Sequence, residues 1–122
     1  MTTRTRTAVF VGITALTAAT GALAGPRAES ALECGIAADM AVVAHSLAHE
    51  HIQRQKADTI MARIYDVSSS ERGQALMKEI IDAAYVPTGP VAQSTSQEFA
   101  QTLYSTCMKS GGDMDQVLGR KL

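Results

Sequence analysis

The sequence has no tryptophan, and aromatic residues make up only 4% of its 122 residues. A chain so poor in aromatic rings has few platforms on which sugars or bases could stack. It also has no run of lysines or arginines, which argues against binding to nucleic acid or to anionic lipid. Alternating apolar and polar runs and Asn-Gly or Asp-Gly turns, the usual strand signals, are missing as well. These absences predict an all-α protein that does not bind nucleic acid.

The first 24 residues have the pattern of a secretory signal peptide. Arg4 and Arg6 give a positive start, residues 8–24 are uncharged, and Ala22-Leu23-Ala24 has the small-x-small form of a cleavage site. A membrane anchor is the alternative, but residues 9–24 provide only 16 apolar or weakly polar positions, fewer than the roughly 20 that a span needs. We therefore expect a cleaved signal peptide and a periplasmic or secreted protein without a membrane span.

The predicted mature part, residues 25–122, is long enough for one small domain. It keeps nine of the 11 basic residues and all 12 acidic ones, so its net charge is −3. It contains two cysteines, Cys34 and Cys107, and an even number in an exported chain predicts a disulfide. The two cysteines are 73 residues apart. In the chain-entropy account, closing a loop of that length stabilises a protein by about 4–5 kcal/mol. A redox-active pair is the alternative, although such cysteines are usually close in sequence.

Apolar residues recur at helical spacing throughout the mature part. They predict a first helix over about 29–52, a second around 57–65, a third around 76–84 and a last over about 96–109. A change of phase predicts a turn within 49–56, although one long bent helix is the alternative. Ser68 with Glu71, and Thr95 with Glu98, have the form of capping boxes. Gly111-Gly112 ends the last helix, and residues 113–122 either form one further turn or fray.

The positions of the cysteines predict the topology. Cys34 is near the start of the first helix and Cys107 is near the end of the last, and these points are neighbours in an up-down-up-down bundle. The fold class expected is therefore a small antiparallel four-helix bundle with one disulfide. Methionines are expected to pack in its core rather than to bind copper, since they show no Met-x-x-Met clustering: Met40, Met61, Met77, Met108 and Met114.

Three histidines lie within seven residues of each other near the end of the first predicted helix. His45 and His49 are four residues apart, so both rings can face one Zn, Cu or Ni ion. His51 lies on another face of a continuous helix and can join them only if the helix ends near Glu50. The histidines can be interpreted in three ways: as an ordinary polar surface, as a metal site at His45 and His49, or as a sensor of acid pH.

No motif in the sequence indicates catalysis. Gly-x-Ser-x-Gly and His-Glu-x-x-His are both absent, and the serine clusters are explained as helix caps. We therefore predict no enzyme and no catalytic residue. Tyr65, Tyr85 and Tyr104 are candidate contacts to a partner, because tyrosine is enriched at the energetic centres of protein interfaces.

Three segments together resemble small exported helical proteins of Gram-negative bacteria that carry one early and one late cysteine. They are Cys34 with Ala38, Ala41 and Ala44, the run Ile80-Ile81-Asp82-Ala83-Ala84-Tyr85 before a proline, and Phe99 with Tyr104-x-x-Cys107. Some periplasmic immunity proteins, which block toxins delivered by type VI secretion, look broadly similar. The resemblance implies a small helical protein that binds another exported protein.

The functional expectation is thus a non-enzymatic protein-binding module of the cell envelope, with an immunity or inhibitor protein as its most concrete form. Metal binding at His45 and His49 is the first alternative, with Zn or Cu as the ion. A pH-responsive periplasmic chaperone is the second. The oligomeric state does not follow from the sequence.

Overall fold

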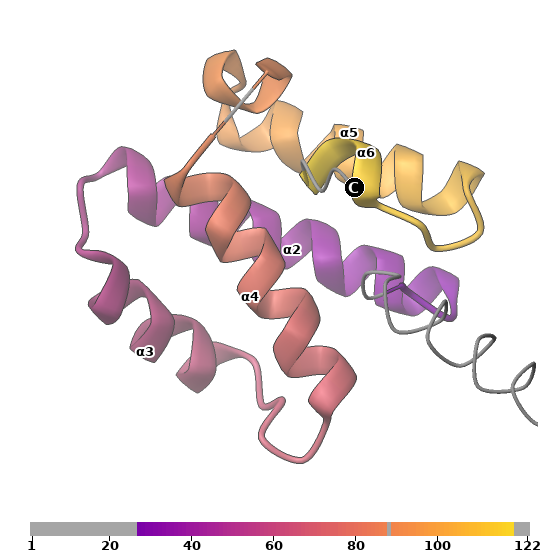
Figure 1. The fold of residues 1–122 in the computed structure, drawn as a ribbon, viewed down its shortest axis with the longest axis horizontal. Coiled ribbons are helices and arrows are strands. Elements are labelled where there is room, and N and C mark those ends of the chain that lie inside the picture. Colours follow the sequence, from indigo (N-terminus) through magenta and orange to yellow (C-terminus); the bar gives the residue numbers. More distant parts are fainter. Residues whose placement is uncertain (1–26, 88, 119–122) are drawn as a thin grey trace, which may run out of the picture.

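A computed structural model of the chain describes residues 27–87 and 89–118, shown as a coloured ribbon in Figure 1. The predicted signal peptide, residues 1–24, lies outside this part. Four main helices pack together: α2 (Ala31–His49), α3 (Arg54–Ile64), α4 (Glu71–Tyr85) and α5 (Ser96–Lys109). A 3-10 turn, η2 (Gly89–Gln93), precedes α5, and the short α6 (Asp115–Leu118) follows it. The predicted all-α fold is confirmed.

Contacts near the helix ends define the directions of the helices. Arg72 at the start of α4 binds Glu33 at the start of α2 (2.7 Å), so these two helices run the same way. Arg54 at the start of α3 binds Asp82 near the end of α4 (2.5 Å), so α3 runs opposite to both. In Figure 1, α3 and α5 lie on opposite sides of α2. The bundle is therefore up-down-up-down, with α2 in contact with the other three main helices.

The disulfide joins the first turns of α2 to the last turn of α5. The sulfur atoms of Cys34 and Cys107 are 2.03 Å apart and their Cα atoms 5.7 Å apart, so the predicted pairing is confirmed. Along the same side of α2, Ala37, Ala41 and Ala44 are completely buried. Because these side chains are small, neighbouring helices can approach α2 closely there. The facing side of α5 supplies the bulk of the contact through Phe99, Leu103 and Cys107.

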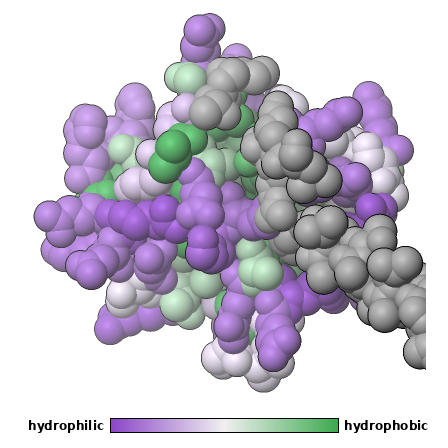
Figure 2. All heavy atoms as spheres, in the orientation of Figure 1, coloured by the Kyte–Doolittle hydropathy of each residue, from purple (hydrophilic) through white to green (hydrophobic). Residues whose placement is uncertain are grey.

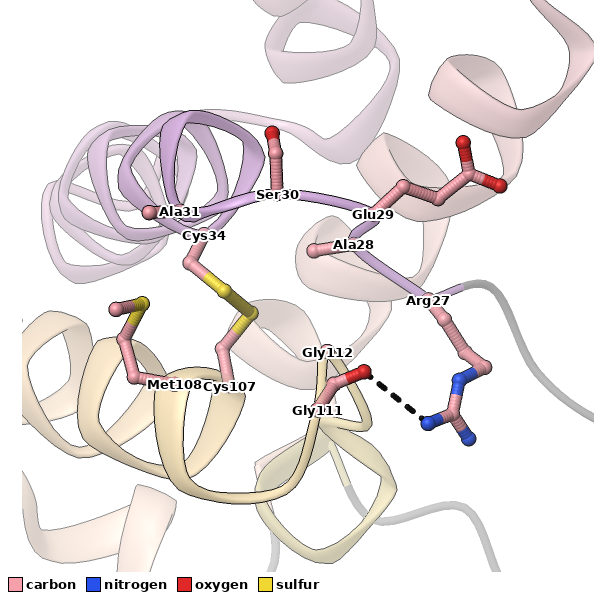
Figure 3. A pocket seen from close by; sticks show the side chains of 10 residues that line it. All are labelled: Arg27, Ala28, Glu29, Ser30, Ala31, Cys34, Cys107, Met108, Gly111 and Gly112. Carbon is pink, nitrogen blue, oxygen red and sulfur yellow. Dashed lines mark hydrogen bonds between the residues drawn. A yellow bond between two sulfur atoms is a disulfide. The ribbon is translucent and has the colours of Figure 1, made fainter.

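The chain ahead of α2 is fixed against the loop that follows α5, beside the disulfide (Figure 3). The Ala28 N–H donates to the Gly112 carbonyl (3.1 Å), and the Arg27 guanidinium donates to the Gly111 carbonyl (3.2 Å). Gly112 has a φ of 97°, and a Cβ atom there would lie 1.9 Å from the Ala28 carbonyl oxygen. Only glycine allows this approach of two backbones. The predicted stop at Gly111-Gly112 therefore also anchors the N-terminal segment.

The first helix is shorter than the predicted range of 29–52, because each end is capped inside it. Ser30 accepts a hydrogen bond from the Glu33 N–H at the start. At the other end, the Ile52 N–H donates to Leu47 and the His51 N–H to Ala48, and His51 has a φ of 63°. This pattern is a Schellman motif with histidine at the left-handed position usually filled by glycine. A turn, and not a bend in one long helix, thus separates α2 from α3.

One of the two predicted capping boxes is wrong. Ser70, not Ser68, caps α4 by accepting from the Gly73 N–H (2.9 Å). The Ser68 hydroxyl instead donates to Asp66 (2.9 Å), in a turn that holds it away from the helix. The second box is confirmed, since Thr95 and Glu98 each satisfy the other's backbone N–H.

The methionines were all expected in the core, and one of them is not there. Met40, Met61, Met77 and Met114 are buried. Met108 is 46% exposed, because it follows Cys107 on α5 and points away from the side that packs on α2. Of the two alternatives for the tail, the further turn is present as α6, which buries Leu118.

Replacing both cysteines by alanine is expected to lower the free energy of unfolding by roughly 2–5 kcal/mol, since the unfolded chain is no longer restricted by the closed loop. Urea denaturation of the oxidised protein and of the Cys34→Ala/Cys107→Ala variant measures the difference. An unchanged midpoint would show that the disulfide contributes nothing to the fold.

A second substitution tests the Schellman motif. His51→Gly is expected to raise the free energy of unfolding by about 0.5–1 kcal/mol, because glycine adopts a positive φ without steric cost. His49→Gly, inside the last turn of the same helix, is the matched control and should lower it by about 1 kcal/mol. Equal destabilisation by both variants would contradict the assigned backbone conformation.

Candidate functional site

The outer side of α2, opposite its alanine side, is apolar and uncovered. Leu32 is 73% exposed and Ile36 39% exposed. They lie one turn apart, with Gly35 and Asp39 on the same face of the helix. Only 28% of the most apolar 18-residue stretch of α2 is buried, although α2 is the central helix of the bundle. The domain therefore exposes apolar surface on the helix that also forms its core.

Side chains from α3 and α5 turn this exposed strip into a groove, which we call the α2 groove. Ile64 at the end of α3 and Tyr104 on α5 line it together with Leu32 and Ile36. Ile64 is 53% exposed and Tyr104 41% exposed. The hollow has a volume of about 580 Å³, and Tyr104 also lines a second hollow between α2 and α5. Apolar residues from three helices thus share one concave surface.

Two carboxylates and a tyrosine hydroxyl supply the polarity of the α2 groove. The Tyr65 hydroxyl donates to the Asp39 carboxylate, which ties the end of α3 to α2. Burial, together with that bond to Asp39, raises the pKa of Tyr65 well above its usual value. Asp66 is the second carboxylate, and no basic residue is among the described residues that line the groove. The groove is therefore apolar with a negative margin.

Other surfaces of the domain differ from this groove. Figure 2 shows one face, which is mainly hydrophilic, with hydrophobic residues visible only as small islands. The pocket beside the disulfide in Figure 3 is lined mostly by backbone and small side chains. Its two charged residues are already engaged, Arg27 with Gly111 and, at 3.7 Å, with Asp113, and Glu29 with Arg72 at 3.4 Å. The α2 groove is accordingly the surface best suited to bind an apolar ligand.

The three histidines line one pocket at the opposite end of α2, between that helix and the chain around η2. The helix ends at His49, and the positive φ of His51 turns its side chain toward the same pocket as His45. Within the described ranges, however, no group of three or more His, Cys, Asp or Glu side chains is placed to hold a metal ion. His45 and His49 stay a predicted two-ligand site, with Zn or Cu as the ion.

His45 connects the end of α2 to the start of α5. Its Nδ1 lies 2.8 Å from the Ser96 Oγ, and its ring packs against Phe99 with 5.7 Å between centroids. Burial lowers the pKa of His45 below its usual value, and the nearby His49 lowers it further. The folded protein therefore favours the neutral form of the His45 imidazole.

The three candidate tyrosines have different positions. Tyr65 and Tyr104 both line the α2 groove. Tyr85 lies away from it, where its hydroxyl donates to the Ile52 carbonyl (2.7 Å) and its ring faces the Arg54 guanidinium at 5.9 Å. Tyr85 thus fixes the turn between α2 and α3, and the two remaining tyrosines share the exposed groove.

By length and composition, α2 is also apolar enough to cross a membrane, a test that core helices and signal sequences pass as well.

Comparisons of the chain with protein-family models, with curated proteins and with solved structures find no match. The resemblance to exported helical proteins therefore stays a prediction, and the function has to be argued from the geometry.

Sequence reasoning missed the apolar residues of the groove, Leu32, Ile36 and Ile64. A signal for them is present in the sequence, because apolar residues recur along a second side of the first helix: Ile36, Met40, Val43 and Leu47. Periodicity alone predicts packing on both sides, since a helix with two apolar sides is usually central in its bundle. The structure places α2 at the centre and buries Met40 on this side, but it leaves Ile36 39% exposed.

Acidification is expected to destabilise the fold through His45. Because its pKa is lower in the folded protein than in the unfolded chain, the unfolded chain takes up the proton first as the pH falls below about 6.5. The free energy of unfolding should therefore decrease between pH 6.5 and 5, and it should decrease less in His45→Gln. Urea denaturation at pH 7.5, 6.5, 5.5 and 5 measures this, with the pH 7.5 value showing that the variant folds. If the free energy of unfolding of His45→Gln falls with pH as steeply as that of the unaltered protein, the role of His45 is contradicted.

Proposed function

We propose that this protein is a non-enzymatic binding module of the cell envelope whose α2 groove receives another exported protein. The observation that carries the proposal is the exposure of Leu32, Ile36, Ile64 and Tyr104 on one concave surface. Soluble monomers rarely expose contiguous apolar patches, and those they do expose are often interaction sites. Tyrosine at such a position supplies a large contact area at a low cost in side-chain entropy.

The framework around the groove supports the proposal. The disulfide holds α2 against α5, and the hydrogen bond from Tyr65 to Asp39 holds the end of α3 against α2. Both walls of the groove are thus attached to its floor before a partner arrives. A surface that is already organised loses less conformational entropy on binding, which favours affinity.

Export is part of the proposal and rests on the predicted signal peptide, Met1–Ala24. The disulfide agrees with it, since such bonds persist in oxidising compartments. An immunity or inhibitor protein is the most concrete form of this function, and the resemblance described above supports it. Metal binding at His45 and His49 and pH-responsive chaperoning stay predictions from the sequence. No contact among the described residues favours either over the groove.

The test is capture from the native envelope fraction with three forms of the tagged, disulfide-intact protein. Ile36→Asp places a charge in the groove, where burial against an apolar partner would leave the charge unpaired. Val86→Asp is the matched control, because Val86 is also exposed (69%) but does not line the groove. We expect the unaltered chain and Val86→Asp each to capture one protein in stoichiometric amount. Ile36→Asp should capture at least tenfold less of that protein.

Thermal unfolding of both variants provides the control for folding, since neither position is buried in the core. A partner retained equally by Ile36→Asp and by Val86→Asp would show that binding does not use the groove, and the proposal would fail. Zinc or copper in the purified protein, with no protein partner, would favour the histidine pair instead.

A further inference from the structure

The α2 groove carries charge of one sign only. Asp39 contributes a carboxylate from its floor, and Asp66 contributes a second one just after α3. Arg63, which precedes Ile64 in sequence, is not among the residues that line the groove. A carboxylate has room for about four hydrogen bonds, so Asp39 keeps acceptor capacity beside its bond from Tyr65. A partner that covers the apolar floor must therefore also satisfy two anions.

The shape of the groove restricts the kind of partner. It follows α2 from Leu32 to Met40, and Tyr104 also lines a second hollow, beside Ala38 and Val42. A shallow apolar groove that runs along a helix suits an amphipathic helix, whose apolar ridge repeats every three to four residues. A lipid surface suits it less, because it is flat, and because anionic headgroups would meet the two carboxylates and no basic side chain lining the groove.

Resting on the protein-binding function proposed above, we infer that the partner inserts an amphipathic helix whose apolar ridge is flanked by lysine or arginine. The ridge contacts Ile36 and its apolar neighbours, while the flanking cations pair with Asp39 and Asp66. Such charge-assisted hydrogen bonds select the partner and fix its orientation. They also avoid leaving a buried carboxylate without a counterion.

Two labelled helical peptides test the inference by fluorescence anisotropy with the disulfide-intact protein. They share one leucine ridge and differ only in its flanks, which are lysine in one and glutamate in the other. At low salt the lysine peptide should bind roughly tenfold more tightly, and the difference should shrink at 0.5 M salt. Asp39→Asn with Asp66→Asn should reduce the difference to about twofold, and asparagine still accepts from Tyr65. Ile36→Asp should abolish binding of both peptides, and Val86→Asp should change neither.

Equal binding of the two peptides to the unaltered protein would overturn the basic-partner inference and leave the groove as a binding surface. Lack of binding by both peptides would overturn the inference that a helix occupies the groove. So would binding to phosphatidylglycerol vesicles that is lost in Ile36→Asp. The proposed function fails separately, when capture of an envelope protein does not depend on Ile36.

Discussion

The contact between α2 and α5 determines the rest of this structure. The disulfide between Cys34 and Cys107 fixes one end of it, and the hydrogen bond between His45 and Ser96 fixes the other. Between these ends the side of α2 that packs inward consists mainly of alanine, so the neighbouring helices lie close to it. Met40 is the one large apolar side chain of α2 that is buried, whereas Leu32 and Ile36 are exposed on the outer side of the helix.

The same arrangement explains why a domain of this size needs the covalent bond. Eight of its buried hydrophobic residues are alanines, each of which removes little apolar area from water: Ala28, Ala37, Ala41, Ala44, Ala57, Ala83, Ala84 and Ala100. Small domains have a low share of buried surface in any case. The disulfide restricts the unfolded chain and so offsets a core with little bulk. The larger apolar side chains on the outside of α2 are then available for a partner.

The sequence predicted the parts of this fold that depend on local pattern. Helical spacing indicated the four helices, and the positions of Cys34 and Cys107 indicated which helix ends meet. The box at Ser68 was wrong because Asp66 competes for that hydroxyl, which depends on a turn and not on spacing. The exposure of Ile36 was not predicted, since periodicity shows that one side of a helix is apolar but not whether a neighbouring helix covers it. The convergence of three histidines needed the positive φ of His51, which the sequence did not signal because glycine, the usual residue at that position, is absent there.

Site-specific photo-crosslinking in cells tests the central claim most directly. A photoreactive amino acid replaces Ile36 on the outer side of α2, and in a second strain it replaces Val86, which is exposed elsewhere. If the exposed side of α2 is the binding surface, position 36 will crosslink to one envelope protein of defined mass, and position 86 will not. The absence of a crosslink at position 36, with a specific partner crosslinked at position 86, would contradict the account and place the interface on another part of the domain.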